Sequence, residues 1–313
     1  MIQIIVFSYN RAMQLDTLLY SLYEHWKYPR IVVDVVYNFS NEEFDTAYDL
    51  LKKKYSDKKI GFHRENRLNP DRTKLKDLFH LYNLVRLYKD KKLRHPKTDF
   101  RSIVIKLIEQ SKSTDVMFLT DDSMFISDIK IDDTILDWIN EKPQDRQFSL
   151  RLGKGHGALP ARVSEKGNLC EWNMYENEGD WGYPFSVDAH IYNSRYLLKL
   201  LKTYLFYNPS YLEGNICGVV RRKKNFSEGR CFTDIKMLTF PINIVQSSVD
   251  NDSLNVSVEI LNQRFLKGES LEYVLNESFD SKKQYVKMIK FTDANGNSYI
   301  EEISQDMVRP NLK

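Results

Sequence analysis

Two hydrophobic patterns alternate along the first part of the chain. Largely apolar runs occupy residues 2–7, 31–37 and 115–120, as expected for strands that are buried on both faces of a parallel sheet. Apolar residues recur at helical spacing over residues 13–23 and 44–51. This alternation of strand and helix predicts an α/β fold, in which a mostly parallel sheet is flanked by helices.

The pattern becomes less regular toward the C-terminus. Further elements are predicted as strands at 60–63, 148–152 and 185–192 and as helices at 77–88, 100–110, 195–204 and 256–275. A turn sequence at 293–297 predicts a hairpin near the end of the chain. We therefore expect one large α/β domain that is followed by a C-terminal extension.

Polar segments follow three of the predicted strands. They lie at residues 8–11, at 38–41 and at the pair Asp121-Asp122. Because ligands of such sheets bind outside the carboxyl ends of the strands, the topology would gather these three segments into one cleft.

The composition narrows the class of protein. The chain has 313 residues, of which 42% are hydrophobic, so it can form a sizeable core. A net charge of +3 does not indicate a nucleic-acid partner. The three cysteines form no CxxC pair and favour a reducing cytoplasm. Basic clusters at 52–54, 91–92 and 221–224 leave peripheral contact with the inner membrane face open.

The pair Asp121-Asp122 is the strongest chemical signal. Two adjacent carboxylates at the end of a buried strand raise each other's pKa unless a cation compensates their charge. A divalent metal is a natural compensator, because Mg²⁺ or Mn²⁺ binds one or two carboxylates and completes its shell with water and phosphate oxygens. The plainer alternative is that Asp122 or Ser123 caps a turn.

Two segments, taken together, point to a known family. Residues 6–11 read Val-Phe-Ser-Tyr-Asn-Arg and are followed by Gln-Leu at 14–15, and residues 118–123 read Phe-Leu-Thr-Asp-Asp-Ser. These segments resemble GT-A-fold glycosyltransferases, in particular family 2-like enzymes of bacterial surface polysaccharide synthesis. The resemblance covers residues 1 to about 215 with decreasing clarity. It implies a GT-A-like sheet and a DXD-like motif whose third position is Ser123.

The resemblance also implies a substrate and the residues that bind it. The donor would be a nucleoside-diphosphate sugar, with a UDP-sugar favoured, and the acceptor a hydroxyl of a glycan or lipid-linked molecule. The residues that would contact the donor are Phe7, Ser8, Tyr9, Arg11, Asn38 and Asp121. Tyr9 would stack on the base, Asn38 would read the edge of the base, and Asp122 would bind Mn²⁺ or Mg²⁺. Tyr9 as a rim aromatic and Arg11 as a solvated residue at a helix start are the plainer alternatives.

An inverting sugar transfer needs a general base that takes the proton of the acceptor hydroxyl. Asp188 stands at about the distance after the acidic motif where the resembled enzymes carry their base, and Glu213 is a rival base or an acceptor-binding carboxylate. His190 would share a face with Asp188 if this segment is a strand. It would then be a third metal ligand, a phosphate partner or a core histidine.

We expect residues 1–245 to form a GT-A-like catalytic domain, with a nucleotide-binding half (1–125) and an acceptor half (126–245). Residues 246–313 are expected to form a helical and hairpin extension. Two other functions stay open: a sugar-phosphate nucleotidyltransferase, and a catalytically silent binding protein of a glycan assembly. Phosphate-loop, dinucleotide-binding, zinc-protease and hydrolase-elbow motifs are absent from the sequence.

Overall fold

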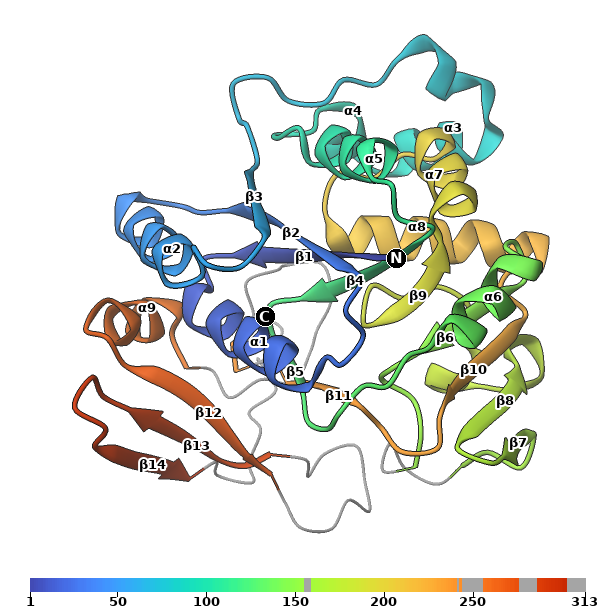
Figure 1. Cartoon of the computed structure of the whole chain (residues 1–313). Coiled ribbons are helices and arrows are strands. Elements are labelled where there is room, and N and C mark those ends of the chain that lie inside the picture. The colour runs from blue at the N-terminus through green and yellow to red at the C-terminus, as the bar shows by residue number, and fades with distance from the viewer. Residues whose placement is uncertain (155–158, 241, 244–255, 276–285, 303–313) are drawn as a thin grey trace.

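The computed structural model describes residues 1–154, 159–240, 242–243, 256–275 and 286–302. A nine-stranded sheet forms its centre, in the order β3-β2-β1-β4-β9-β6-β10-β8-β7 (Figure 1). The strands of this sheet are β1 (Ile2–Tyr9), β2 (Ile31–Asn38), β3 (Ile60–Arg64), β4 (Asp115–Thr120), β6 (Arg146–Ser149), β7 (Val163–Lys166), β8 (Leu169–Asn173), β9 (His190–Asn193) and β10 (Glu228–Phe232).

The sheet is mixed. Strands β3, β2, β1 and β4 pair in parallel, whereas β9 is antiparallel to both of its neighbours, β4 and β6. Beyond β9, β10 is parallel to β6 and antiparallel to β8. The predicted α/β class is therefore confirmed, and the parallel part is the one whose apolar runs are clearest in the sequence.

Helices cover both faces of this sheet. The helices that precede the C-terminal extension, including those at the rim of the molecule, are α1 (Ala12–His25), α2 (Glu42–Lys54), η1 (Leu75–Phe79), α3 (Leu81–Lys89), α4 (Lys91–Arg94), α5 (Phe100–Gln110), α6 (Asp133–Glu141), η2 (Met174–Glu176), η3 (Gly179–Gly182), α7 (Ser194–Thr203) and α8 (Pro209–Lys223). Alternate residues of β1 enter different cores: Ile4 and Val6 pack with α1 and α2, and Ile5 and Phe7 pack with α5, α7 and α8. This is the two-residue periodicity of a strand with an apolar layer on each face.

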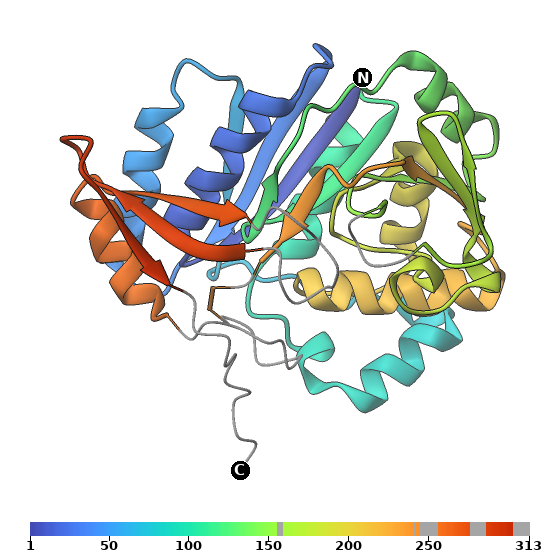
Figure 2. The ribbon, with the colours of Figure 1, turned by 90° about the horizontal axis from the view of Figure 1, so that it is seen from below.

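The C-terminal extension adds α9 (Val258–Leu266) and a three-stranded antiparallel sheet of β12 (Ser270–Leu275), β13 (Val286–Thr292) and β14 (Ser298–Glu302). Figure 2 shows these elements beside α1 and α2. Leu271 and Phe291 share the core of β1 and α1, so the extension packs on the main domain. The predicted domain boundary at residue 245 lies outside the described residues.

In the extension, the prediction of a helix over 256–275 is partly wrong, and the prediction of a hairpin at 293–297 is confirmed. The helix predicted over 256–275 ends at Leu266, because Gly268 has a positive φ of 85° that breaks the helix. Leu271 and Tyr273 are then buried as alternate residues of a strand. The hairpin predicted at 293–297 does connect β13 and β14. None of the helices in the described ranges combines the length and the hydrophobicity that are needed to cross a membrane.

Candidate active site

The three polar segments that follow β1, β2 and β4 meet at one edge of the sheet, as predicted. The backbone N–H of Tyr9 donates to Asp121 Oδ2 at 3.2 Å, and the N–H of Asp121 donates to the carbonyl of Phe7 at 3.1 Å. The N–H of Asn10 donates to the carbonyl of Asn38 at 3.3 Å. Asn10 has φ of 58°, the left-handed conformation that Asn tolerates better than most residues, and this turns the chain toward β2.

Arg11 connects the first loop to the acidic pair. Its Nη1 lies 2.9 Å from Asp121 Oδ1 and 3.2 Å from Asp122 Oδ2. Its Nε donates to Asn243 Oδ1 at 2.7 Å, and Nη2 donates to the carbonyl of the same residue. Burial lowers the pKa of Arg11, but Asp121 and Asp122 outweigh burial and raise the pKa overall. The guanidinium therefore supplies charge compensation that the sequence suggested a metal would supply.

The two aspartates differ in how they are engaged. Asp121 is buried, and Arg11 and the backbone of Tyr9 bind its two oxygens. Burial raises the pKa of Asp121 to about 6, and Arg11 opposes this rise. The side chain of Asp122 is 14% exposed, and its Oδ1 is buried with no hydrogen-bond partner among the described residues. Only Asp122 therefore keeps a carboxylate oxygen for another ligand.

The donor set at Asp122 fits a hydrated divalent ion that is completed by a substrate. The described residues contain no cluster of three or more His, Cys, Asp or Glu side chains placed to hold a metal. Mg²⁺ and Mn²⁺ do not require such a cluster, since one or two carboxylates and phosphate oxygens suffice. The Oδ1 of Asp122, which has no hydrogen-bond partner in the described part of the chain, is the observation that fits this kind of site.

The other residues of the first loop divide into core and surface. The ring of Phe7 is buried against Phe100 and Phe118, with centroids 5.2 and 5.5 Å away, so only its backbone reaches the site. The hydroxyl of Ser8 lies 2.6 Å from that of the buried Tyr48. Tyr9 is 36% exposed, as an aromatic side chain that receives a ligand must be.

Asn38 has an acidic partner, Glu65, that the sequence pattern did not indicate. Its amide nitrogen donates to Glu65 Oε2 at 3.5 Å, and its Oδ1 accepts from the N–H of Phe39. Glu65 directly follows β3 and so lies at the same edge of the sheet. Burial raises the pKa of Glu65 to about 7, although hydrogen bonds from Thr98 and Asn38 lower it. The only sequence signal for Glu65 was its place after a short strand.

The predicted strand at 185–192 is shorter than expected. Strand β9 begins at His190, and Ala189 before it has φ of 52°, so Asp188 and His190 do not share the face of one strand. His190 is buried, with Nδ1 at 2.8 Å from Gln147 Oε1 and Nε2 at 3.0 Å from Ser149 Oγ. This is the environment of a core histidine. A metal ion would have to displace one of these partners. The role of His190 as a metal ligand stays a prediction.

Asp188 and Glu213 form a second acidic pair. Thr120 Oγ1 donates to Asp188 Oδ1 at 3.2 Å, while Glu213 Oε1 accepts from Ser186 Oγ at 2.8 Å and from the N–H of Val187 at 3.0 Å. Burial raises the pKa of Asp188, Arg151 lowers it and nearby Asp122 adds to the rise. Burial and then Asp188 raise the pKa of Glu213 to about 7. Helix α8 and the turn before β9 thus hold two carboxyl groups whose charges act on each other.

Two further residues join the acidic groups through tertiary contacts. Arg151 lies just after β6, 3.4 Å from Asp180 through Nη2, and its buried Nε has no hydrogen-bond partner among the described residues. Burial lowers the pKa of Arg151, but Asp188, Asp180 and Glu213 outweigh burial and raise it overall.

Tyr273 of β12 is buried, and its hydroxyl also has no hydrogen-bond partner in the described structure. Burial raises the pKa of Tyr273, and the neighbouring Asp122 raises it further. The extension therefore contributes a side chain to this site.

Comparison with known proteins agrees with the resemblance noted in the sequence. No known family profile matches the chain. Over 310 residues, however, it is 23% identical to the bifunctional glycosyltransferase pgtA of Dictyostelium discoideum, in an alignment that covers 86% of this chain and 36% of pgtA. The chain is similar in sequence to a glycosyltransferase. It spans about a third of the length of that curated relative.

Solved structures with a partial likeness include two complexes with nucleotide sugars. One is S. aureus TarS 1-349 in complex with UDP-GlcNAc, with 16% identity, a TM-score of 0.48 and coverage of 80% of this chain and 62% of that one. Another is the mannosyltransferase PcManGT from Pyrobaculum calidifontis in complex with GDP-Man and Mn²⁺, with 15% identity and a TM-score of 0.36. That alignment covers 64% of this chain and 46% of PcManGT.

Proposed function

We propose that the protein transfers a sugar from a nucleoside-diphosphate sugar to a hydroxyl of a glycan or lipid-linked acceptor, with inversion at the sugar carbon. One observation carries the proposal: among the described residues, Asp122 has a buried carboxylate oxygen without a hydrogen-bond partner, while its other oxygen contacts Arg11 and its charge acts on Asp188. The group that would bind the leaving diphosphate and the candidate base would thereby lie at one sheet edge. The sequence similarity to a glycosyltransferase supports the same class of reaction.

The donor would lie across the ends of β1, β2 and β4. The exposed ring of Tyr9 would stack on the base, with a UDP-sugar favoured, and Asn38 with Glu65 would face the base edge. Arg11 would hold Asp121 in place for contact with the ribose or the sugar. Asp122 would bind Mn²⁺ or Mg²⁺ through Oδ1, and such an ion would neutralise charge on the departing diphosphate.

Asp188 would be the general base, with Glu213 as the alternative. A base works best when its pKa is near the working pH, and burial moves both carboxyl groups toward that range. Thr120 orients Asp188 through a hydrogen bond, and Arg151 favours its ionised form. Asp188 would take the proton of the acceptor hydroxyl as that oxygen attacks the sugar carbon and the nucleoside diphosphate leaves.

The first experiment tests donor binding. Thermal melting is measured with a panel of nucleoside diphosphates and nucleotide sugars, with Mn²⁺ and with chelator. We expect one nucleotide sugar to raise the melting temperature with Mn²⁺ only, and Asp122→Asn to remove this response. The matched control is Asp137→Asn, an exposed carboxylate of α6 that should respond like the original protein.

The second experiment separates an enzyme from a silent binding protein. Release of nucleoside diphosphate is followed with the stabilising donor and a set of glycan acceptors. Stabilisation together with acceptor-dependent release supports the transferase, whereas binding with no release for any acceptor supports the silent protein. Release of pyrophosphate from a nucleoside triphosphate and a sugar phosphate would instead identify a nucleotidyltransferase.

A further inference from the structure

One face of α3 carries apolar side chains that the fold leaves exposed. Leu81, Leu84, Val85 and Tyr88 follow one another at helical spacing and are 75%, 43%, 41% and 84% exposed. The opposite face holds the buried Asn83 and Leu87. The preceding η1 also carries the exposed apolar residues Leu75 and Phe79. Soluble proteins rarely expose such a contiguous apolar patch unless it meets a partner or a membrane.

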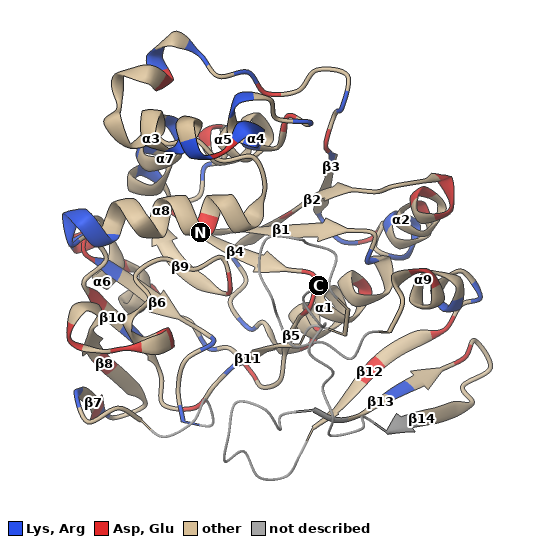
Figure 3. Ribbon diagram, turned by 180° about the vertical axis from the view of Figure 1, so that it is seen from behind, with Lys and Arg blue, Asp and Glu red and all other residues tan. Residues whose placement is uncertain are grey.

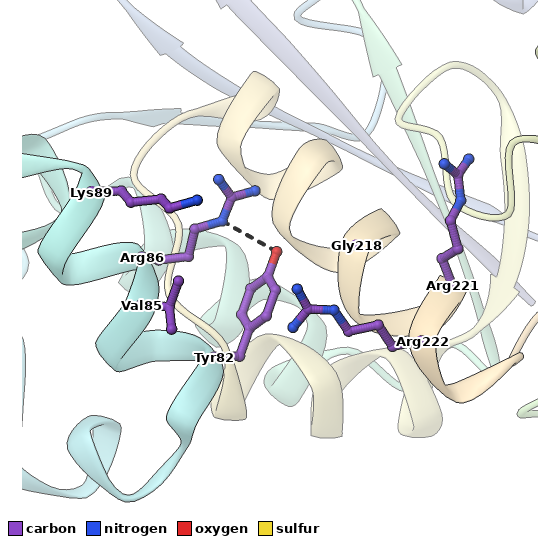
Figure 4. Close-up of a pocket in the computed structure, with 7 residues that line it drawn as sticks. All are labelled: Tyr82, Val85, Arg86, Lys89, Gly218, Arg221 and Arg222. Carbon is purple, nitrogen blue, oxygen red and sulfur yellow. Dashed lines mark hydrogen bonds between the residues drawn. The ribbon is translucent and has the colours of Figure 1, made fainter.

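A basic pocket lies along the edge of this face, between α3 and α8 (Figure 4). Its volume is about 350 Å³, and its lining consists of Tyr82, Val85, Arg86, Lys89, Gly218, Arg221 and Arg222. Val85 belongs both to the pocket and to the apolar face. The four cationic residues of the lining form no ion pair with any carboxylate in the described ranges of the chain.

Tyr82 organises the pocket. Arg86 Nε donates to its hydroxyl at 3.2 Å, and the guanidinium carbons of Arg86 and Arg222 lie 5.5 and 5.0 Å from its ring centroid. Gly218 leaves room for that hydroxyl, since a Cβ at this position would lie 2.7 Å from it. The two arginines are thus held on one ring, where cation–π attraction partly offsets their mutual repulsion.

The charge around the apolar face is strongly positive. Residues 72–94 contain eight Lys or Arg and only two carboxylates. Asp77 is buried against Arg101, and Asp90 accepts a hydrogen bond from the N–H of Lys92 at the start of α4. Figure 3 shows the basic positions along this segment and at the end of α8. The basic residues of this segment therefore have no ion-pair partner among the residues that the structure describes.

We propose that η1, α3 and the C-terminal end of α8 dock on the surface of a membrane that contains anionic phospholipids. The apolar row would enter the boundary between headgroups and acyl chains, and the basic pocket would take a lipid phosphate. A soluble polyanion would satisfy the cations but not the exposed Leu81, Leu84 and Tyr88. The surface lies at the rim of the molecule, away from the C-terminal sheet (Figure 1). This inference does not depend on the proposed enzyme activity.

Vesicle sedimentation tests the proposal. The full chain is mixed with vesicles of phosphatidylcholine alone and with vesicles that also contain phosphatidylglycerol. We expect binding to the anionic vesicles only, weakened by raising the salt concentration because exposed charges are screened. Arg86→Gln with Arg222→Gln should weaken binding on the order of tenfold or more, since each basic residue near the surface contributes measurably. Leu84→Ser with Tyr88→Ser should weaken it comparably.

Matched variants keep the experiment decisive. Lys53→Gln with Lys59→Gln removes two exposed cations elsewhere, and Tyr20→Ser removes an exposed aromatic residue of α1; both should bind like the original protein. Tryptophan at position 88 (Tyr88→Trp) should be quenched by brominated acyl chains, and Tyr20→Trp should not. All variants are compared by thermal melting first, and a variant that melts early is replaced by a single substitution.

Three outcomes would overturn the proposal. One is equal sedimentation with neutral and anionic vesicles. Another is wild-type binding by the Arg86→Gln, Arg222→Gln variant. The third is wild-type binding by the Leu84→Ser, Tyr88→Ser variant together with an unquenched Tyr88→Trp, which would leave a pocket for soluble phosphate but no membrane contact.

Discussion

Arg11 Nη1 lies 2.9 Å from Asp121 Oδ1, and both side chains are almost completely buried. Loss of one partner of such a pair leaves an uncompensated charge, which costs about 3–5 kcal/mol. The pair also connects α1 to the end of β4, two elements that are more than 100 residues apart in the sequence.

Arg11→Met should therefore destabilise the protein by about 3 kcal/mol and abolish donor binding. Urea unfolding at neutral pH measures the first effect, and nucleotide-dependent melting measures the second. Arg195→Met, at an exposed position of α7, is the control and should change neither. Unchanged stability of Arg11→Met would mean that Asp121 does not depend on the guanidinium.

The partly buried Glu65 predicts a pH dependence of stability. Its pKa is raised from 4.5 to about 7 in the folded protein, so the folded state binds the proton more tightly than the unfolded state. Its contribution is fully present below about pH 4.5 and is lost as the pH rises to about 7, by roughly 3 kcal/mol. The free energy of unfolding, measured in urea from pH 5 to pH 8, should fall more for the original protein than for Glu65→Gln. Parallel curves for the two proteins would contradict this assignment.

The two candidate bases make different predictions. Asp188→Asn should lower kcat by about 10²–10⁴-fold while donor-dependent melting is retained, because only proton transfer is lost. Glu213→Gln should lower kcat less and shift the pH–rate profile, since Glu213 contributes to the environment of Asp188. The measurement is the pH dependence of kcat and kcat/KM for both variants. A larger loss of kcat in Glu213→Gln would identify Glu213 as the base.

The C-terminal extension should unfold together with the main domain. Phe291 is 1% exposed and lies in the same core as β1, so Phe291→Ala should cost about 3–5 kcal/mol. Ile300→Ala, at a position that is 55% exposed, is the control and should change stability little. Unfolding followed by both tryptophan fluorescence and circular dichroism should give one transition for each variant. Two separate transitions would show that the extension folds independently.

The sequence predicted the part of the molecule whose patterns are local. Apolar runs identified β1, β2 and β4, and helical spacing identified α1 and α2, because each of these elements buries its own repeating pattern. The meeting of the loops after these strands followed from the parallel topology alone. Strand β9 was less predictable, because Ala189 bends the chain inside a sequence that looks like one continuous strand.

The sequence by itself thus determined the α/β class, the sheet edge that carries the site and the acidic pair at the end of β4. Only the tertiary structure decided which charged group compensates that pair: Arg11 forms ion pairs with both aspartates. It also added Glu65, Arg151 and Tyr273, which lie far from Asp122 in the sequence. The physical reason is that strand and helix formation depend on near neighbours along the chain. Burial, ion pairing and pKa depend on which distant segments the folded core brings together.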